Sequence, residues 1–211
     1  MASEANGKAA TNSSGDRDLQ VYVDLRSPFS FIGKDQIRAL AREFGLNLVW
    51  HPYAIDIAAA YGDDHARDAR ELRKVKYLYM DARRVAEPLG LAIKGPKKIF
   101  DATNAHLGML YARANGMLDP YLDLVYERFF LRELDVEDRA AILDVLTECG
   151  ADIDAAADYM AGAAADELAA ETRAAEENGV FAVPSCVYAG ELYWGVDRLS
   201  LLRRTIADSI G

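Results

Sequence analysis

Early in the chain an apolar, strand-like run leads straight into the start of a helix: Leu19-Gln20-Val21-Tyr22-Val23-Asp24-Leu25-Arg26-Ser27-Pro28-Phe29-Ser30. A strand that runs into a helix leaves the first N–H groups of that helix unpaired, with a partial positive charge behind them. Such a helix start favours an anion. Serine followed by proline is also the usual composition of an N-cap and first helical position. The local sequence alone therefore leaves two interpretations open at Ser27, a structural cap or an anion site.

The next segments complete a β-α-β unit. A helix is expected from about Ser30 to Phe44, because its apolar residues recur at helical spacing and Gly45 follows as a stop. A second strand is expected over Asn47 to Tyr53. Two strands joined by a helix normally pair in parallel with a right-handed crossover.

The remaining two thirds of the chain change character twice. Residues 63–178 show helical periods interrupted by glycines, whereas 180–188 and 191–194 are strand-like and flank Ala189-Gly190, a two-residue turn suited to a hairpin. A last helix is expected from Asp197 towards Ile210. The order βαβ, helical block, ββα predicts an α/β, thioredoxin-like fold with an inserted all-α domain.

These patterns define three parts of the 211-residue chain. Residues 1–18 are expected to form a disordered leader, because they are polar and lack the apolar region of a signal peptide. Residues 19–62 and 179–211 are expected to form the thioredoxin-like domain, and 63–178 the inserted helical domain. No apolar run approaches the roughly 18 to 20 residues that span a bilayer, so a soluble, cytoplasmic protein is expected.

Charge and composition narrow the classes of partner. A formal net charge of −10 argues against nucleic acid and anionic membranes, which leaves small molecules. The histidines His51, His65 and His106 show no ligand spacing, so no metal site is expected, and His106 is either a packed histidine or a general base. Cys149 and Cys186 are far apart, which favours packed thiols in a reducing compartment.

Several short motifs, taken in order, carry a resemblance to a known family. The chain resembles the 2-hydroxychromene-2-carboxylate isomerase family, which is similar to kappa-class glutathione transferases and more distantly to DsbA-like disulfide oxidoreductases. The motifs are 24–31 (DLRSPFSF), Lys76-Tyr77 with Asp81 and Arg84, 172–175 (TRAA), 179–184 (GVFAVP) and 194–199 (WGVDRL). Where a DsbA-like chain carries Cys-x-x-Cys, this sequence reads Ser27-Pro28-Phe29-Ser30, so a sulfur anion would have to arrive on a small molecule.

The resemblance implies a glutathione site around Ser27. In that family the serine that opens the first helix meets the glutathione sulfur. A hydrogen bond to a charged acceptor contributes roughly 1.5 to 3 kcal/mol, enough to lower a thiol pKa by about one to two units. Arg26 is expected to act in the same direction by its charge. The resemblance also implies that Pro184 is a cis-proline and that the Val183 backbone binds glutathione, the alternative being a proline that ends an edge strand.

The segment 195–198 is implied to complete the glutathione site, as Gly195, Val196, Asp197 and Arg198. Asp197 would meet the γ-glutamyl end of glutathione, or act only as a helix cap. The candidate substrate residues are Tyr53, Lys76, Tyr77, Arg84 and Asn104. The run 51–58 departs from the arginine-proline-phenylalanine pattern of the family, which puts the family's own substrate in question while leaving the glutathione half intact.

The function implied is a glutathione-dependent isomerase that acts on an aromatic-derived, conjugated keto acid by reversible thiolate addition. A kappa-like glutathione transferase is the first alternative, since the same thiolate would serve it. A non-catalytic DsbA-like module that binds an extended peptide is the second. Family members are commonly dimers, so a homodimer is also implied, and the aromatic residues Tyr121, Tyr126, Phe129 and Phe130 form either an interface or a core stripe.

Overall fold

The sequence begins to fold into regular structure at the first apolar strand. The structure is a computed structural model that describes residues 17–63 and 65–210. The predicted leader, residues 1–18, lies outside the described residues except for its last two. Strand β1 spans Asp18–Val23, and its alternate residues Leu19, Val21 and Val23 are fully buried.

The sheet has four strands in the order β2-β1-β3-β4. β2 (Asn47–Pro52) runs parallel to β1, β3 (Ser185–Tyr188) runs antiparallel to β1, and β4 (Glu191–Trp194) runs antiparallel to β3. The predicted parallel crossover and the predicted hairpin are therefore confirmed. The hairpin turn has positive φ at both Ala189 (51°) and Gly190 (80°), as a two-residue turn of the twisted hairpin type requires.

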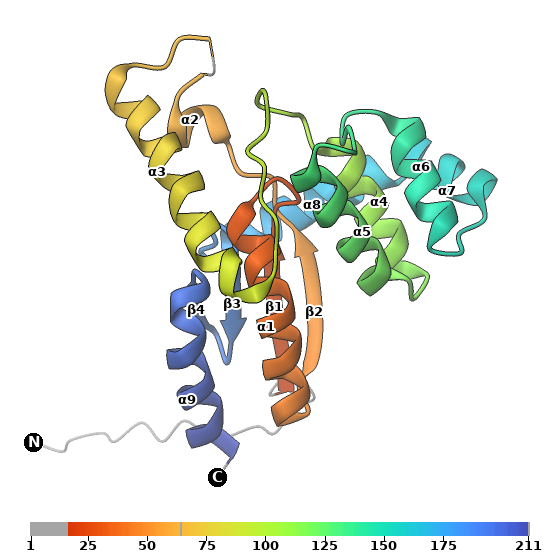
Figure 1. Ribbon diagram of the computed structural model, residues 1–211. Helices are drawn as coiled ribbons and strands as arrows, with labels where there is room; N and C mark the ends of the chain where they lie inside the picture. Colours follow the sequence, from red (N-terminus) through yellow and green to blue (C-terminus); the bar gives the residue numbers. More distant parts are fainter. Residues whose placement is uncertain (1–16, 64, 211) are drawn as a thin grey trace, which may run out of the picture.

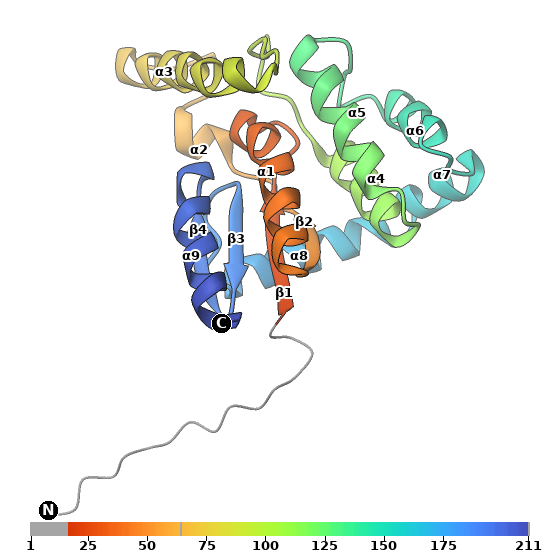
Figure 2. The same cartoon turned by 60° about the horizontal axis from the view of Figure 1, so that its bottom comes forward.

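Helices cover both faces of the sheet. α1 (Pro28–Phe44) and α9 (Leu199–Ile210) lie side by side on one face, and α8 (Ala164–Glu177) crosses the other, next to β2 (Figures 1 and 2). The last helix was expected from Asp197, but a 3₁₀ turn, η3 (Val196–Arg198), comes first. Because Asp197 lies inside that turn, it is not the cap of α9.

The rest of the chain forms two helical groups on either side of α1. α2 (Ile57–Tyr61), α3 (Ala69–Ala86) and the 3₁₀ turn η2 (Glu87–Leu89) lie on one side, where α3 passes across the start of α1 (Figure 2). On the other side lie α4 (Thr103–Ala114), α5 (Leu118–Leu131), α6 (Arg139–Glu148) and α7 (Ile153–Ala161). In the described part of the chain no helix has the length and apolar character that crossing a membrane would take.

The larger of two hydrophobic clusters runs through the sheet and the helical block, and the smaller one contains Tyr22, Ala175, Val180 and Val183. Leu19 of β1 and Leu110 of α4 are both fully buried, and side chains from α1, α4, α5 and α6 pack in the same cluster as the strands. The aromatic residues Tyr121, Tyr126, Phe129 and Phe130 of α5 are at most 4% exposed. The core interpretation of this cluster is therefore confirmed, and the interface interpretation is wrong.

Candidate active site

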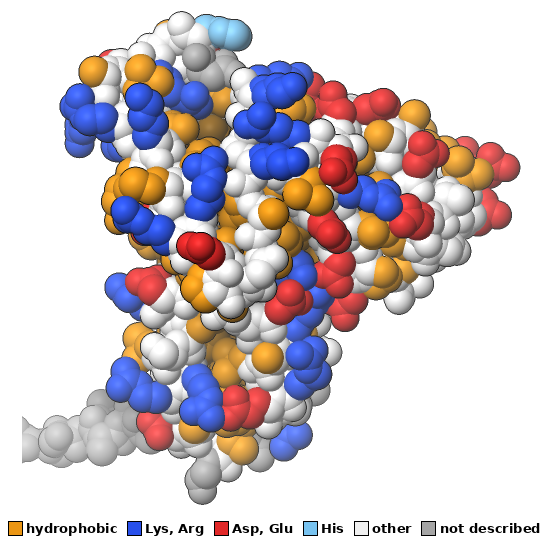
Figure 3. Space-filling view, viewed as in Figure 1, with side chains coloured by type: hydrophobic (Ala, Val, Ile, Leu, Met, Phe, Trp, Pro, Cys, Tyr) orange, Lys and Arg blue, Asp and Glu red, His pale blue; other side chains and the backbone are white. Residues whose placement is uncertain are grey.

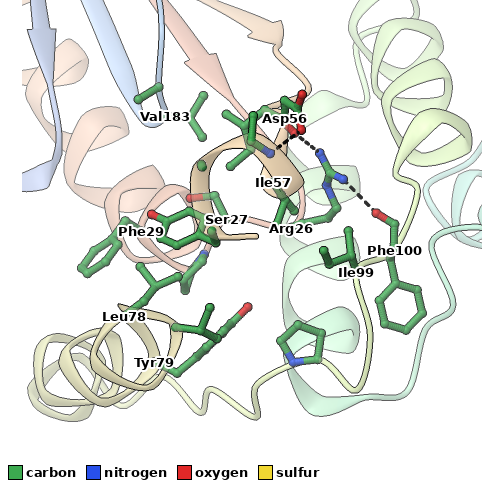
Figure 4. A pocket seen from close by; sticks show the side chains of 18 of the residues that line it. Arg26, Ser27, Phe29, Asp56, Ile57, Leu78, Tyr79, Ile99, Phe100 and Val183 are labelled. Carbon is green, nitrogen blue, oxygen red and sulfur yellow. Dashed lines mark hydrogen bonds between the residues drawn. The ribbon is translucent and has the colours of Figure 1, made fainter. Parts of the chain in front are cut away.

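A cavity of about 680 Å³ lies above the start of α1. Its walls come from the β1–α1 junction, α2, α3, the segment 96–100 and the loop that precedes β3 (Figure 4). Ser27 and Val183 face it from the two halves of the thioredoxin-like part. Most other lining side chains are apolar or aromatic, so the cavity suits an organic ligand with a few polar groups.

Ser27 is the N-cap of α1. Its backbone is extended (φ −81°, ψ 119°), and its Oγ accepts the Ser30 N–H at 3.2 Å. The local sequence explains the geometry, because a hydroxyl oxygen satisfies one of the free N–H groups at a helix start and Pro28 at the first position has none. Cap and cavity residue are thus the same side chain, and the two interpretations of Ser27 are compatible.

Two donors at this helix start stay available to a ligand. Ser27 Oγ accepts a hydrogen bond but donates to no acceptor in the described part of the chain, so its proton is free. The Phe29 N–H likewise has no acceptor among the described residues, and Phe29 also lines the cavity. Both donors sit at the positive end of the α1 dipole.

The loop before β3 supplies the opposite wall. The Val183–Pro184 peptide bond is cis, as the family resemblance implied. The Pro184 carbonyl accepts the Gly195 N–H at 2.9 Å, which fixes the loop to the end of the hairpin. Within residues 17–63 and 65–210, neither the N–H nor the carbonyl of Val183 has a hydrogen-bond partner. An extended peptide could pair with these two groups, because a buried backbone group without a partner is costly.

The Arg26 side chain is held by a buried carboxylate. Asp24, fully buried, accepts the Arg26 backbone N–H and Nε at 2.8 and 2.9 Å and Nη2 at 2.6 Å. Arg26 also donates to the carbonyls of Phe100 (2.8 Å) and Ile55 (3.0 Å), as Figure 4 shows in part. Burial opposes the charged form of Asp24, but the hydrogen bonds from Arg26 hold its pKa below the usual value. Because Asp24 balances the charge of Arg26, the predicted action of Arg26 on a thiol is largely cancelled.

His106 lies behind this pair and outside the cavity lining. It is fully buried, its Nε2 accepts the Leu25 N–H at 3.3 Å, and it lies 3.7 Å from Asp24 Oδ1. Burial lowers its pKa despite the nearby Asp24 carboxylate. His106 is therefore a packed neutral histidine that supports the β1–α1 junction, and the general-base interpretation is not supported by its position.

The segment 195–198 borders the site without lining the cavity. Gly195 has φ 94°, and Val196 packs against α1 at Gly33, where an added Cβ would lie 2.8 Å from Val196 Cγ1. The Asp197 carboxylate is exposed and forms a surface ion pair with Arg198 at 2.8 Å. The roles implied for these four residues in glutathione binding stay predictions.

Four of the five candidate substrate residues lie away from the cavity, and only Tyr53 lines it. Lys76, Tyr77 and Arg84 are exposed, because the inner face of α3 is formed by the stripe Val75, Leu78, Tyr79, Ala82 and Ala86. Asn104 donates to the Glu137 carbonyl at 2.7 Å and ties α4 to the turn before α6. The family motif therefore pointed to residues on the solvent-facing side of α3.

The structure brings in cavity residues that the sequence interpretation missed. They include Tyr61 of α2, Arg67 just before α3 and Tyr79 of α3. The exposed aromatic pair Phe181 and Trp194, whose ring centroids lie 5.1 Å apart in an edge contact, also lines the cavity. The apolar stripe at spacing three and four along residues 75–86 would have placed Tyr79 inward. Nothing in the local sequence identifies Tyr61, Arg67 or the aromatic pair.

Comparison with known proteins identifies the relatives of this chain. A family model described as DSBA-like thioredoxin domain matches residues 18–207. A 2-hydroxychromene-2-carboxylate isomerase of Pseudomonas putida is 30% identical over 191 residues, which cover 87% of this chain and 91% of the relative. The chain belongs to the 2-hydroxychromene-2-carboxylate isomerase family. Its thioredoxin-like, DsbA-type fold agrees with the expectation from the sequence.

Two further members of the 2-hydroxychromene-2-carboxylate isomerase family are similar over most of their length. The isomerase of Pseudomonas sp. (strain C18) is 29% identical over 194 residues, 89% of each chain. A solved structure of a 2-hydroxychromene-2-carboxylate isomerase superposes with a TM-score of 0.74 at 26% identity, covering 92% of this chain and 96% of that one. These relatives support an enzyme of the isomerase class.

The two cysteines of this isomerase-family chain are not placed for dithiol chemistry at the start of α1. Cys186 is buried in β3, and burial raises its pKa to about 12. Cys149 follows α6, outside the cavity, and burial raises its pKa as well. Since neither thiol reaches the start of α1, the α1 motif itself offers a hydroxyl where a disulfide oxidoreductase needs sulfur.

Proposed function

We propose that this chain is a glutathione-dependent isomerase of the 2-hydroxychromene-2-carboxylate isomerase type, acting on a conjugated keto acid derived from an aromatic compound. The observation that carries the proposal is the Ser27 hydroxyl, which caps α1 with its oxygen and keeps its proton for a group in the cavity. Glutathione, when bound, supplies a sulfur nucleophile that can add reversibly to the conjugated system.

The residues present fit glutathione in two respects. Ser27 and the Phe29 N–H can both donate to an anion at the positive end of α1, where a hydrogen bond to charge contributes about 1.5 to 3 kcal/mol. Across the cavity the unpaired N–H and carbonyl of Val183 can bind the backbone of a tripeptide. The rest of the cavity leaves room for an aromatic substrate beside them.

In this proposal Ser27 stabilises the negative charge of the bound sulfur and takes no part in proton transfer. A serine hydroxyl stays protonated at neutral pH, so Ser27 is a donor that favours the charged form of a bound sulfur and does not accept its proton. The paired Asp24 and Arg26 hold the β1–α1 junction in place beneath it. The sulfur adds to the substrate and is later eliminated, so the thiol is regenerated and the reaction has no net redox change. The expected homodimer and cytoplasmic location stay predictions.

The decisive experiment compares glutathione binding and turnover in wild type and Ser27→Ala. Reduced glutathione at about one hundred times the wild-type Kd should raise the free energy of unfolding of wild type by about 2.7 kcal/mol. Ser27→Ala should show a smaller but measurable rise at the same concentration, because it loses the hydrogen bond to the sulfur and keeps the Val183 backbone. Turnover of 2-hydroxychromene-2-carboxylate by Ser27→Ala should fall about 10- to 100-fold, the loss of one hydrogen bond to a charged group. Ser200→Ala, an exposed serine of α9, is the matched control.

Each contrary result points to a different correction. Wild-type protein that shows no thermal shift with millimolar glutathione would favour the peptide-binding module. Glutathione conjugation to a simple electrophile without isomerisation would favour the kappa-like transferase. Full isomerase activity in Ser27→Ala would remove Ser27 from the mechanism.

A further inference from the structure

Tyr79 occupies the floor of the cavity with its polar end unused. Its ring packs against Gly95, where an added Cβ would lie 3.5 Å from the ring, and its hydroxyl points into the cavity (Figure 4). No residue in the described part of the chain forms a hydrogen bond with that hydroxyl. Burial is the main cause that raises the pKa of Tyr79 well above its ordinary value, with the neighbouring Tyr61 adding to the effect. Tyr79 is therefore a neutral donor that faces the cavity.

Tyr61 and Arg67 stand close to this hydroxyl. Both line the cavity, and both act on the pKa of Tyr79, which Tyr61 raises and Arg67 lowers. The Arg67 Nε donates to the carbonyls of Tyr61 (3.0 Å) and Gly62 (3.1 Å), which anchors the guanidinium. The two Nη nitrogens of Arg67 and the Tyr61 hydroxyl have no acceptor among residues 17–63 and 65–210. The cluster thus offers two phenol hydroxyls and a guanidinium, all of which can donate to an anion.

The charge around the cluster also favours an anion. Residues 65–98 contain ten of the 24 Lys and Arg residues of the chain but four of its 34 Asp and Glu residues. Figure 3 shows these cations gathered over α3 and the loop that follows it, while acidic side chains gather over the helices on the other side. The one acidic side chain among the described residues of the lining, Asp56, caps α2 by accepting the Ala59 N–H at 2.9 Å.

We propose that Tyr61, Arg67 and Tyr79 form a subsite that binds the carboxylate of the organic substrate, which makes this end of the cavity selective for aromatic-derived acids. The inference rests on the proposed function for the identity of the substrate, and on the donor cluster for the position of its carboxylate. Two phenol donors and a guanidinium match the lone pairs of one carboxylate. Ser27 then faces the conjugated part of the same molecule.

Binding of an unreactive pair of probes tests the subsite directly. Chromone-2-carboxylate and its neutral chromone-2-carboxamide have nearly the same shape, and their Kd values can be measured by calorimetry. Wild type should bind the carboxylate at least about tenfold more tightly than the carboxamide. Tyr79→Phe, Tyr61→Phe and Arg67→Gln should each weaken carboxylate binding about tenfold and carboxamide binding about threefold or less.

Matched controls are available outside the cavity. Tyr188→Phe removes a hydroxyl that bonds Ser209 beneath α9, and Arg73→Gln removes an exposed cation of α3, so both should bind the carboxylate as wild type does. Circular dichroism confirms the fold of each variant. Equal affinity of wild type for the two probes, or unchanged discrimination in all three variants, would overturn the subsite.

A parallel isomerase assay separates the subsite from the proposed function. Carboxylate discrimination that depends on Tyr79 and Arg67, in a protein without isomerase activity, would retain the subsite and reject the function. Isomerase activity in a protein that does not distinguish the two probes would retain the function and reject the subsite.

Discussion

Ser27 shows how one hydroxyl can serve structure and chemistry together. Its oxygen is used by the cap of α1 and its proton is not, so the cap leaves the donor free. The neighbouring Arg26, which has the stronger charge, is matched by the buried Asp24. The start of α1 therefore presents a neutral donor, the Ser27 hydroxyl, to the cavity. The charges of Asp24 and Arg26 compensate each other behind it.

Glu171 gives the clearest dependence of stability on pH. Burial works against its charged form, but hydrogen bonds from His51 and Arg113 overcome that and lower the pKa of Glu171 from 4.5 to about 2. A depressed carboxylate pKa stabilises the fold above the unfolded value and loses that effect as pH falls. The contribution should therefore be complete above about pH 4.5 and should disappear between there and about pH 2.

Urea unfolding of Glu171→Gln at several pH values tests whether Glu171 is the source of this pH dependence of stability. At neutral pH the variant should lose on the order of 2 kcal/mol, and the difference from wild type should shrink through the acid window. Glu177→Gln, an exposed position on the same helix, should follow wild type throughout. A difference that does not change between pH 7 and about pH 2 would contradict the assignment.

At the level of residues the sequence located the half of the site around Ser27 and Val183 better than the candidate substrate residues. The strand-to-helix junction indicated an anion site or a cap at Ser27, the family resemblance implied the roles of Ser27 and Val183, and both residues line the cavity. Lys76 and Tyr77 were chosen by motif, although helical spacing turns them outward. Tyr61 and Arg67 reach the cavity because α2 packs against α3, which no local pattern encodes.

Among the elements, α1 is the one that positions the site. Its start carries Ser27, its middle accepts Val196 closely at Gly33, and its outer face is tied to α5 by ion pairs. In those pairs Lys34 and Arg38 share Asp123 at 2.6 and 2.7 Å. The helical block therefore holds the helix that bears the hydroxyl.

Packing of the helical block depends on a close approach at Gly108 of α4. An added Cβ there would lie 2.5 Å from Tyr121 Oη and 2.8 Å from Ile142 Cγ2. The Tyr121 hydroxyl cannot move away freely, because it donates to the Ala105 carbonyl at 2.7 Å. Gly108→Ala should therefore cost about 1 to 3 kcal/mol of stability, measured by urea unfolding.

A double-mutant cycle shows whether the hydroxyl is the obstacle. In a Tyr121→Phe background the atom nearest to the new Cβ is gone, so Gly108→Ala should cost less than it does alone. Equal costs in the two backgrounds would mean that the contact with Ile142 Cγ2, and not the Tyr121 hydroxyl, sets the cost.

The elements themselves were largely predictable, and their ends were less so. Alternation identified β1 and the hairpin, and helical spacing identified α1, because each element buries one face. The last helix was displaced by a 3₁₀ turn at 196–198, since that turn is set by the contact with α1 and not by local preference. The division into two domains stays a prediction, and the hydrophobic core is continuous across it.

Across the whole molecule, charge is separated by side. The protein has a net charge of −10, yet ten of its 24 Lys and Arg residues fall within residues 65–98, and cations gather on the surface over α3 and the loop that follows it (Figure 3). Such a field draws anionic ligands toward one end of the molecule and keeps them from the other. The acidic surface therefore contributes to solubility, and the cation-rich surface attracts the anionic ligand.

Ionic strength measures this effect. Affinity for chromone-2-carboxylate should fall roughly three- to tenfold between about 20 mM and about 500 mM salt, because ions screen the exposed part of the field. The neutral carboxamide is the control and should change by less than about twofold. Parallel behaviour of the two probes would show that the cation-rich surface of residues 65–98 does not contribute to binding.

The order of the sheet has a consequence for synthesis on the ribosome. Ser27 follows the first strand and Val183 precedes the third, yet they form opposite walls of one cavity, with the whole helical block made between them. A nascent chain therefore carries a finished first helix long before it has a ligand site. Products that end before Val183 lack one wall of the cavity and should not bind the ligand. Only chains translated almost to their end can form the complete site.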